Sequence, residues 1–234
     1  MSAIPVRWLT VFLDFPAGSF GAGMAFWREV TGSTLSPFRG AAGEFATLLP
    51  PSGDPYLRVQ RVAGGSGGHH LDLHVDPALA SVEQAAERAV ALGAKVLHRE
   101  LGLVISASPG GFTFCLVRWH GEGTVPGPVR LDGAGASRAD ELCLDIPAGT
   151  FERERSFWTA LTGWEGQDGA RSVRLGFQPC DDAGPVTGRL GFSCTDPARL
   201  AARHAAAGAR ILAVLPHETA MADPVGRLYR LTGR

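Results

Sequence analysis

Apolar and polar residues alternate along many short stretches of the chain, which is the pattern of strands with one buried face. In residues 8–15 the apolar positions Leu9, Val11 and Leu13 fall on one face of such a strand. The same pattern predicts further strands at residues 45–49, 56–62, 69–75, 95–97, 103–107, 112–117, 141–146, 173–178, 189–194, 211–215 and 227–231.

One stretch occurs twice, because residues 12–32 recur as residues 143–163 with ten of 21 aligned positions identical. Each copy ends a strand, turns at Pro-Ala-Gly and continues with helical spacing of its apolar residues, so the chain is an internal duplication. We expect Ser19 and Thr150 to be the N-caps of the two helices. A Phe-Trp pair in each copy is expected to pack in the core and not to bind a ligand.

The order of elements is strand, helix and then two or three strands, and it occurs four times. A further helix is predicted to begin at Asp76 and to end at Gly93. Between Trp119 and Arg138, seven of twenty residues are Gly or Pro, which predicts a linker. We therefore predict domains at residues 1–118 and 139–234, joined by residues 119–138. The third unit is short enough to lack a strand.

The composition narrows the classes of partner and compartment. The formal net charge is −1, and no basic stretch is suited to tracking phosphates, so nucleic acid and membrane surfaces are not expected partners. The four scattered cysteines lack the Cys-x-x-Cys spacing of a metal or redox motif and are expected to be reduced thiols. Without a signal sequence or a long apolar segment, the chain is expected to be cytoplasmic.

Four short motifs occur in a fixed order, and the first two of them are present in both halves. The first strand of each half ends in Leu-Asp-x-Pro, the helix carries Phe-Trp and ends in Thr-Gly, residues 70–73 read His-Leu-Asp-Leu, and residues 223–226 read Asp-Pro-Val-Gly. Together they resemble the glyoxalase-like branch of the vicinal oxygen chelate superfamily, which includes glyoxalases, bleomycin resistance proteins and dioxygenases. The resemblance implies an α+β fold of four βαβββ units, forming two tandem incomplete barrels with helices outside and a ligand cavity on the concave face.

The resemblance also implies where a metal would bind. Metal-dependent members hold a cation with His or Glu from the first strand of each unit and Glu from the last strand of the pair. His70 matches one of these places, but the first strand offers Trp8 or Thr10, and Cys115 stands at the place of the Glu. One imidazole and one thiol suit hard cations poorly. We therefore expect no cofactor, and a divalent metal such as zinc on His70, His74 and Cys115 is the disfavoured alternative.

Alternation places His70, Asp72 and His74 on the cavity face of their strand, opposite Leu71, Leu73 and Val75. The predicted ligand-binding residues of the first domain are Trp8, Phe12, Arg58, Gln60, His70, His74, Phe114 (or Phe112) and Cys115. We expect this cavity to bind a small, partly aromatic molecule. The alternative is a lyase or isomerase that acts on a small carbonyl compound, with His70 or His74 as the general base and with or without a metal. The sequence leaves open whether the protein is an enzyme.

The second domain lacks the metal-binding pattern altogether. Arg189 stands where His70 stands in the first domain, and Arg230 takes the place of the terminal ligand. Glu141 is the remaining carboxylate on the inward face, and we expect it to pair with an arginine. Since four units lie in one chain, the two domains are expected to form an internal pseudo-dimer within a monomer, or else the chain forms a homodimer.

Overall fold

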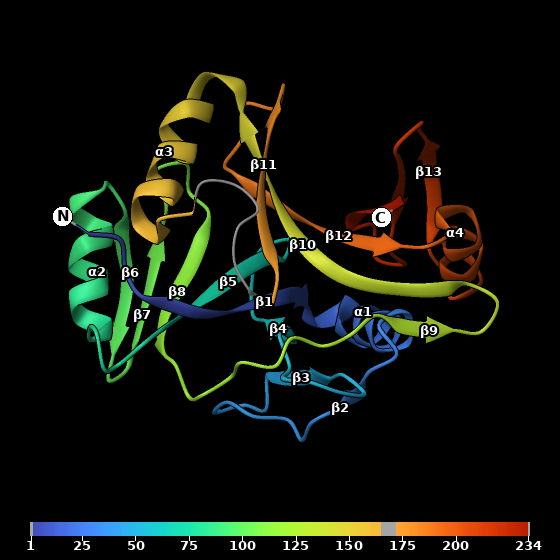
Figure 1. Cartoon of the computed structure of the whole chain (residues 1–234), viewed down its shortest axis with the longest axis horizontal. Helices are drawn as coiled ribbons and strands as arrows, with labels where there is room; N and C mark the ends of the chain where they lie inside the picture. The colour runs from blue at the N-terminus through green and yellow to red at the C-terminus, as the bar shows by residue number, and fades with distance from the viewer. Residues whose placement is uncertain (1, 165–171, 234) are drawn as a thin grey trace. The chain divides into compact units, whose positions relative to one another are not determined.

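The computed structural model describes residues 2–164 and 172–233, and it has a mixed α+β fold with two sheets (Figure 1). The elements of the first sequence half are β1 (Val6–Pro16), α1 (Ala17–Val30), β2 (Thr34–Leu35), β3 (Phe45–Leu49), β4 (Leu57–Val62), β5 (Gly68–Val75), α2 (Val82–Ala91), β6 (Lys95–Glu100), β7 (Leu103–Ala107) and β8 (Thr113–Arg118). Those of the second half are β9 (Val129–Leu131), β10 (Gly135–Pro147), α3 (Phe151–Thr162), β11 (Arg174–Cys180), β12 (Thr187–Cys194), α4 (Pro197–Ala206), β13 (Arg210–Val214), β14 (Glu218–Ala222) and β15 (Leu228–Gly233).

Each sequence half builds one sheet. The eight strands of the first half lie in the order β2-β3-β4-β1-β5-β8-β7-β6, and those of the second half in the order β11-β10-β12-β15-β14-β13, with β9 paired to β10. In both sheets the first and last strands of the second βαβββ unit of that half pair in parallel, β5 with β8 and β12 with β15. The repeated topology confirms the α+β fold of paired units that the sequence predicts. Over the described residues, the third unit has one strand after its helix, β11.

The chain divides into two compact units, and each unit takes segments from both halves of the sequence. Unit 1 comprises residues 1–11, 69–123 and 143–188, and unit 2 comprises residues 12–68, 124–142 and 189–234. The tandem division with a linker at residues 119–138 stays a prediction. Within that stretch, β9 and the first residues of β10 form an antiparallel pair.

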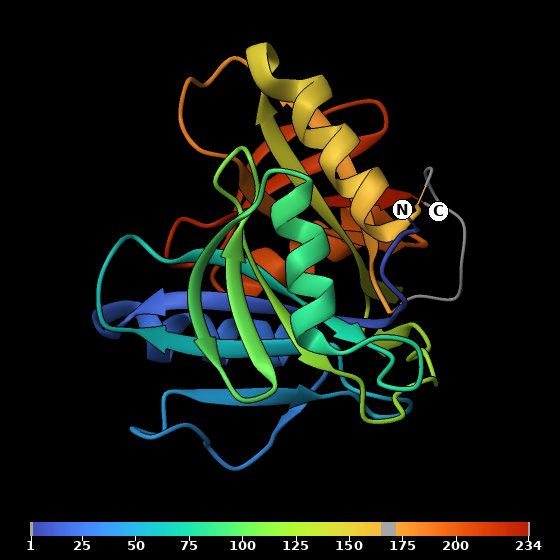
Figure 2. The same cartoon turned by 90° about the vertical axis from the view of Figure 1, so that its left-hand side faces the viewer.

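The core of unit 1 lies between its helices and β8. Phe114 on β8 is fully buried against Phe157 and Trp158 of α3, with ring centroids 5.9 and 5.2 Å away. Phe112 also meets the Trp158 ring edge-on. On the same unit, α2 packs against β6, β7 and β8 (Figure 2).

The core of unit 2 repeats this arrangement with α1 and the second sheet. Trp27 of α1 is fully buried, stacks on Phe192 of β12 and meets Tyr229 of β15 edge-on. Phe26 and His204 complete the cluster. The Phe-Trp pair of each repeat is therefore a core element, as predicted, and in both units the helix of one sequence half packs on strands of the other half.

A buried carboxylate accepts a hydrogen bond from each of the two helix tryptophans. In unit 2, Trp27 Nε1 donates to Asp223 Oδ2 over 2.9 Å. In unit 1, Trp158 Nε1 donates to Glu154 Oε1 over 2.9 Å, and the Gly110 N–H donates to Glu154 Oε2 over 2.7 Å. Asp223 thus connects α1 to the turn before β15, and Glu154 connects α3 to the turn before β8. Each of these strands is the last of a βαβββ unit.

Of three predicted helix starts, two were wrong and one was confirmed. α1 begins at Ala17 with Pro16 as its N-cap residue, and the Ser19 hydroxyl donates back to the Pro16 carbonyl. Thr150 is the N-cap residue of α3, as predicted, although its side chain makes no cap hydrogen bond. α2 begins at Val82, because Ser81 and Gln84 form a capping box there.

Asp76 lies in a turn before α2. It accepts hydrogen bonds from the Ala78 N–H and from Arg7 Nε, and these bonds lower the pKa of its carboxyl group. Strands β2 and β14 had no clear alternation in the sequence and were missed. No helix among the described residues is long and apolar enough to cross a bilayer.

Candidate functional site

Strand β5 carries a row of polar side chains on one face. Leu71, Leu73 and Val75 are fully buried, and Leu71 pairs with Phe114, which lies beneath α3. Because side chains alternate along a strand, His70, Asp72 and His74 project from the opposite face. The predicted division of this strand into a helix-facing side and a polar side is therefore confirmed.

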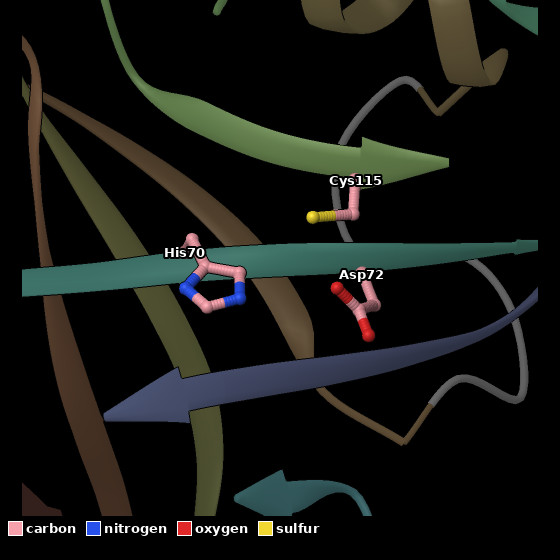
Figure 3. Close-up of side chains that lie close together, drawn as sticks. All are labelled: His70, Asp72 and Cys115. Carbon is pink, nitrogen blue, oxygen red and sulfur yellow. The ribbon is translucent and has the colours of Figure 1, made fainter. Parts of the chain in front are cut away.

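His70, Asp72 and Cys115 come together on this polar face of unit 1 (Figure 3). Asp72 on β5 is in register with Cys115 on the parallel neighbour β8. One nitrogen of His70, one oxygen of Asp72 and the sulfur of Cys115 all lie within 4.8 Å of one another. Asp72 and Cys115 are buried, at 4% and 6% exposure, whereas His70 is half-buried, so solvent reaches the group from His70.

His74 lies on the predicted face of β5 but does not belong to the group of His70, Asp72 and Cys115. Its Nε2 atom lies 3.0 Å from the Thr10 hydroxyl oxygen, and its Nδ1 atom lies 3.6 Å from Glu122 Oε1. His74 is 2% exposed, so a hydroxyl and a carboxylate flank a buried imidazole. Asp72 therefore takes the third place beside His70 and Cys115 that the zinc alternative gave to His74.

Thr10 and Glu122 were missed as site residues. Thr10 was considered from the sequence and set aside as a poor metal ligand. Glu122 lies in the predicted linker, in a turn where Trp119 Nε1 donates to the Glu122 carbonyl over 2.8 Å. No sequence signal singles out Glu122, because its approach to His74 depends on how the chain turns after β8.

The predicted aromatic residues fall in different places. Phe114 and Phe112 lie beneath α3 and not beside His70, since odd and even positions of β8 face opposite sides. Trp8 is fully buried in unit 1. In unit 2, the Arg58 guanidinium carbon lies 5.3 Å from the Phe12 ring centre, a cation-π geometry.

Gln60 of unit 2 is in register with Phe45, and Phe45 meets Phe12 edge-on. The structure thus brings Phe12, Arg58 and Gln60 to neighbouring strands of unit 2. Whether they bind a ligand stays a prediction.

The corresponding face of the second sheet carries an ion-pair cluster. Arg230 Nη2 lies 2.9 Å from Glu141 Oε2, which confirms the predicted pairing of Glu141 with an arginine. Arg230 Nη1 lies 3.4 Å from Glu218 Oε2. A Cβ atom at Gly191 would come within 3.0 Å of Glu141 Oε2, so these side chains lie directly over the backbone of β12.

The His70–Asp72–Cys115 group can be tested as a metal site by its donor atoms. Imidazole, carboxylate and thiolate are all ligands of zinc, whereas magnesium and manganese favour sets made of oxygen. In a tetrahedral zinc site the donor atoms lie about 3.3–3.7 Å apart, as follows from bond lengths of about 2.0–2.3 Å. The three donor atoms lie within 4.8 Å of one another, so the group does not support the metal-free prediction.

Comparison with known families gives one match. The model of a family described as glyoxalase-like domain matches residues 10–117 and 141–232, which is most of both sequence halves. None of the curated proteins compared with the chain matches it.

Several solved structures share the fold over the whole chain. A Mn(II)-bound glyoxalase from Novosphingobium aromaticivorans has a TM-score of 0.68 and 18% identity, over 100% of this chain and 83% of that one. A 2,2',3-trihydroxybiphenyl 1,2-dioxygenase from Sphingomonas wittichii has a TM-score of 0.65 and 16% identity, over 100% and 91%. An extradiol ring-cleaving dioxygenase from B. fuscum has a TM-score of 0.66 and 12% identity, over 100% and 73%. At these identities the likeness concerns the fold alone.

Proposed function

Since the chain belongs to the glyoxalase-like domain family of the vicinal oxygen chelate superfamily, we propose that it binds a small organic molecule on the polar face of β5 in unit 1. The observation that carries this proposal is the row of His70, Asp72 and His74 on a strand whose other face is core. A fold of this kind supports many chemistries, so the argument depends on the site and not on the family.

The polar row offers hydrogen-bonding groups to a small molecule. Few polar groups set in an apolar surrounding fix the orientation of a ligand, and an imidazole can both donate and accept a hydrogen bond. His70 is the half-buried member of the row and is the first to meet a ligand from solvent. The expected ligand is small and partly aromatic, with a carbonyl or hydroxyl group that His70 can hydrogen-bond. This binding requires no cation.

A thermal-shift screen tests the proposal. Its panel contains aromatic antibiotics and thiol adducts of 2-oxoaldehydes, and a ligand is expected to raise the melting temperature of the wild-type protein. His70→Ala is expected to abolish the shift. His98→Ala is the matched control, because His98 is an exposed histidine of the same unit and should leave the shift unchanged. A shift of full size in His70→Ala would place the ligand elsewhere.

The second candidate function is a lyase or isomerase that acts on a small carbonyl compound. The observation that favours it is His74, whose ring lies between the Thr10 hydroxyl and the Glu122 carboxylate. The hydrogen bond to the hydroxyl orients the ring, and a nearby carboxylate stabilises the positive charge that an imidazole acquires as a general base. Such a base removes the proton from the carbon next to the carbonyl group and returns a proton to the product.

Hydrogen exchange separates the two candidates. In deuterated water, turnover by His74 would place deuterium on the carbon next to the carbonyl group, and NMR would detect it. His74→Gln would stop this exchange while a ligand still bound through His70. Binding without any exchange in the wild-type protein would leave the binding function and exclude the enzymatic one for that ligand.

A further inference from the structure

We propose that strand β13 of unit 2 is the contact surface between two copies of this chain, which associate about a two-fold axis with their β13 strands side by side and antiparallel. This β13 surface consists of the exposed aliphatic residues of the strand and of the turn that follows it, Ile211, Leu212, Val214 and Leu215. The sequence left both a monomer and a homodimer open, and this surface favours the homodimer. The inference concerns unit 2 and does not depend on the proposed ligand binding in unit 1.

The β13 surface exposes a contiguous group of large aliphatic side chains. Every residue from 210 to 217 is exposed. Val214 is 75% exposed, and the other three aliphatic residues of the surface are each 47–49% exposed. Single exposed apolar side chains are common on proteins, whereas a contiguous group of them indicates an interaction surface.

The backbone of β13 has an open edge. The strand ends the order of the second sheet, where it pairs with β14 (Figure 1). In the part of the chain that the structure describes, its other edge pairs with no strand. Open edges of apolar strands tend to associate with another chain, and natural proteins commonly prevent this with charged side chains. An antiparallel copy of the same strand fits such an edge, because a two-fold axis presents the same surface from both copies.

The equivalent strand of the first sheet carries the charged residues that β13 lacks. β6 is likewise the last strand of its sheet, and residues 93–97 (Gly-Ala-Lys-Val-Leu) correspond to residues 208–212 (Gly-Ala-Arg-Ile-Leu). The register of both strands shifts at the leucine. After this bulge, β6 continues with the exposed residues 98–100 (His-Arg-Glu), whereas β13 continues with residues 213–215 (Ala-Val-Leu). The repeated fold therefore does not require an apolar edge, and its presence in one half alone indicates a separate role.

The charges at the two ends of β13 are complementary in an antiparallel pair of copies. Arg210, at the start of β13, is exposed and in register with Ala222 of β14. Glu218 begins β14 beside the end of β13, where the Leu215 N–H donates to the Glu218 carbonyl over 2.8 Å. Because Glu218 and Ala222 are four residues apart on one strand, Glu218 and Arg210 lie on the same face of the sheet. A two-fold axis perpendicular to the sheet therefore brings Arg210 of each copy toward Glu218 of the other.

Sedimentation velocity of the full chain over a wide range of concentrations tests the proposal. The wild-type protein is expected to sediment as a dimer at high concentration and to dissociate on dilution. Val214→Arg is expected to weaken the dimer at least about 100-fold, because the two-fold axis brings two like charges into an apolar contact. Leu97→Arg places the same charge at an exposed leucine of β6 and should leave the dimer unchanged. A wild-type monomer at every concentration would overturn the proposal, as would a Val214→Arg dimer as stable as the wild-type one.

A charge reversal and hydrogen exchange test the arrangement of the two copies. Arg210→Glu is expected to weaken the dimer by about 10-fold, since an attraction that occurs twice becomes a repulsion, and an unchanged dissociation constant would refute the antiparallel arrangement. Thermal melting identifies a variant that fails to fold, and hydrogen exchange of the wild-type protein then decides. The amides of residues 210–215 should exchange more slowly at high than at low concentration, whereas those of residues 95–100 should exchange at equal rates. Exchange at β13 that does not depend on concentration would overturn the proposal.

Discussion

The carboxylate of Glu154 tests how α3, from the second half of the sequence, is attached to the turn before β8, from the first half. Glu154 is fully buried on α3 and accepts hydrogen bonds from Trp158 Nε1 at 2.9 Å and from the Gly110 N–H at 2.7 Å. Glu154→Ala removes both bonds. The buried indole N–H then lacks its acceptor at a cost of about 1–3 kcal/mol, and the Gly110 N–H, nearer solvent, adds about 1 kcal/mol.

We expect Glu154→Ala to lower the free energy of unfolding by about 2–4 kcal/mol. For a chain of this length, the melting temperature should fall by about 5–12 °C. Denaturant and thermal unfolding measure these two quantities. The exposed Glu152→Ala on the same helix is the control and should change the free energy by less than about 0.5 kcal/mol.

Unit 2 shows how the stability lost in Glu154→Ala can be restored. There the carboxylate comes from the turn, as Asp223, and the helix has Gly23 at the position of Glu154. Ser108 stands at the position of Asp223 in unit 1. Ser108→Asp should therefore restore about 1 kcal/mol or more in the Glu154→Ala background.

In the wild-type background the same Ser108→Asp change should destabilise the protein, because it places a second carboxylate beside Glu154. A double-mutant cycle measures this reversal of sign. An equal effect of Ser108→Asp in both backgrounds, or a cost of Glu154→Ala below about 1 kcal/mol, would refute the reasoning.

Three further predictions concern other buried polar groups. Burial lowers the pKa of His204 from 6.5 to about 3, so the unfolded chain takes up a proton between these pH values and the folded chain does not. The stability from this group is present above pH 6.5 and is lost as the pH falls. His204→Phe should therefore reduce the loss of unfolding free energy between pH 6.5 and pH 4 by about 3 kcal/mol. If the unfolding free energies of both proteins fell equally over this pH range, the prediction would be refuted. Arg230→Met should cost about 2 kcal/mol in denaturant unfolding because Glu141 loses its guanidinium partner, and replacing both residues by apolar ones should cost less. Thr10→Val keeps the shape of the side chain but removes the bond to His74, and a loss of about 1 kcal/mol is expected by the same measurement; stability equal to wild type would contradict the bond.

The fold could be predicted from the sequence largely because its signals are local. Strand alternation and the helix Phe-Trp pair are each visible within about twenty residues, and the duplication shows the same local signals twice. Together they predict the α+β architecture, the polar face of β5 and the buried helix faces. The start of α2 could not be placed as well, because Asp76 and Ser81 both offer capping chemistry and only the capping box with Gln84 decides between them. The weakly alternating β14 forms a strand because it pairs with β13 and β15.

The composition of the candidate site was only partly predictable. Alternation placed His70, Asp72 and His74 on one face, and the motif count placed Cys115 near them. Which of the three meets the thiol depends on the register of β5 against β8, two strands about forty residues apart along the chain. A shift of two residues in this register would bring His74, instead of Asp72, opposite Cys115.

The amino-acid sequence alone therefore determined the repeated units and the side of each strand that is polar, since both follow from side-chain direction along a short segment. The tertiary structure decided which sheet each helix covers, which carboxylate accepts from each buried tryptophan, and that Glu122 reaches His74. These choices depend on contacts between residues far apart in the chain, where no local pattern favours one partner over another.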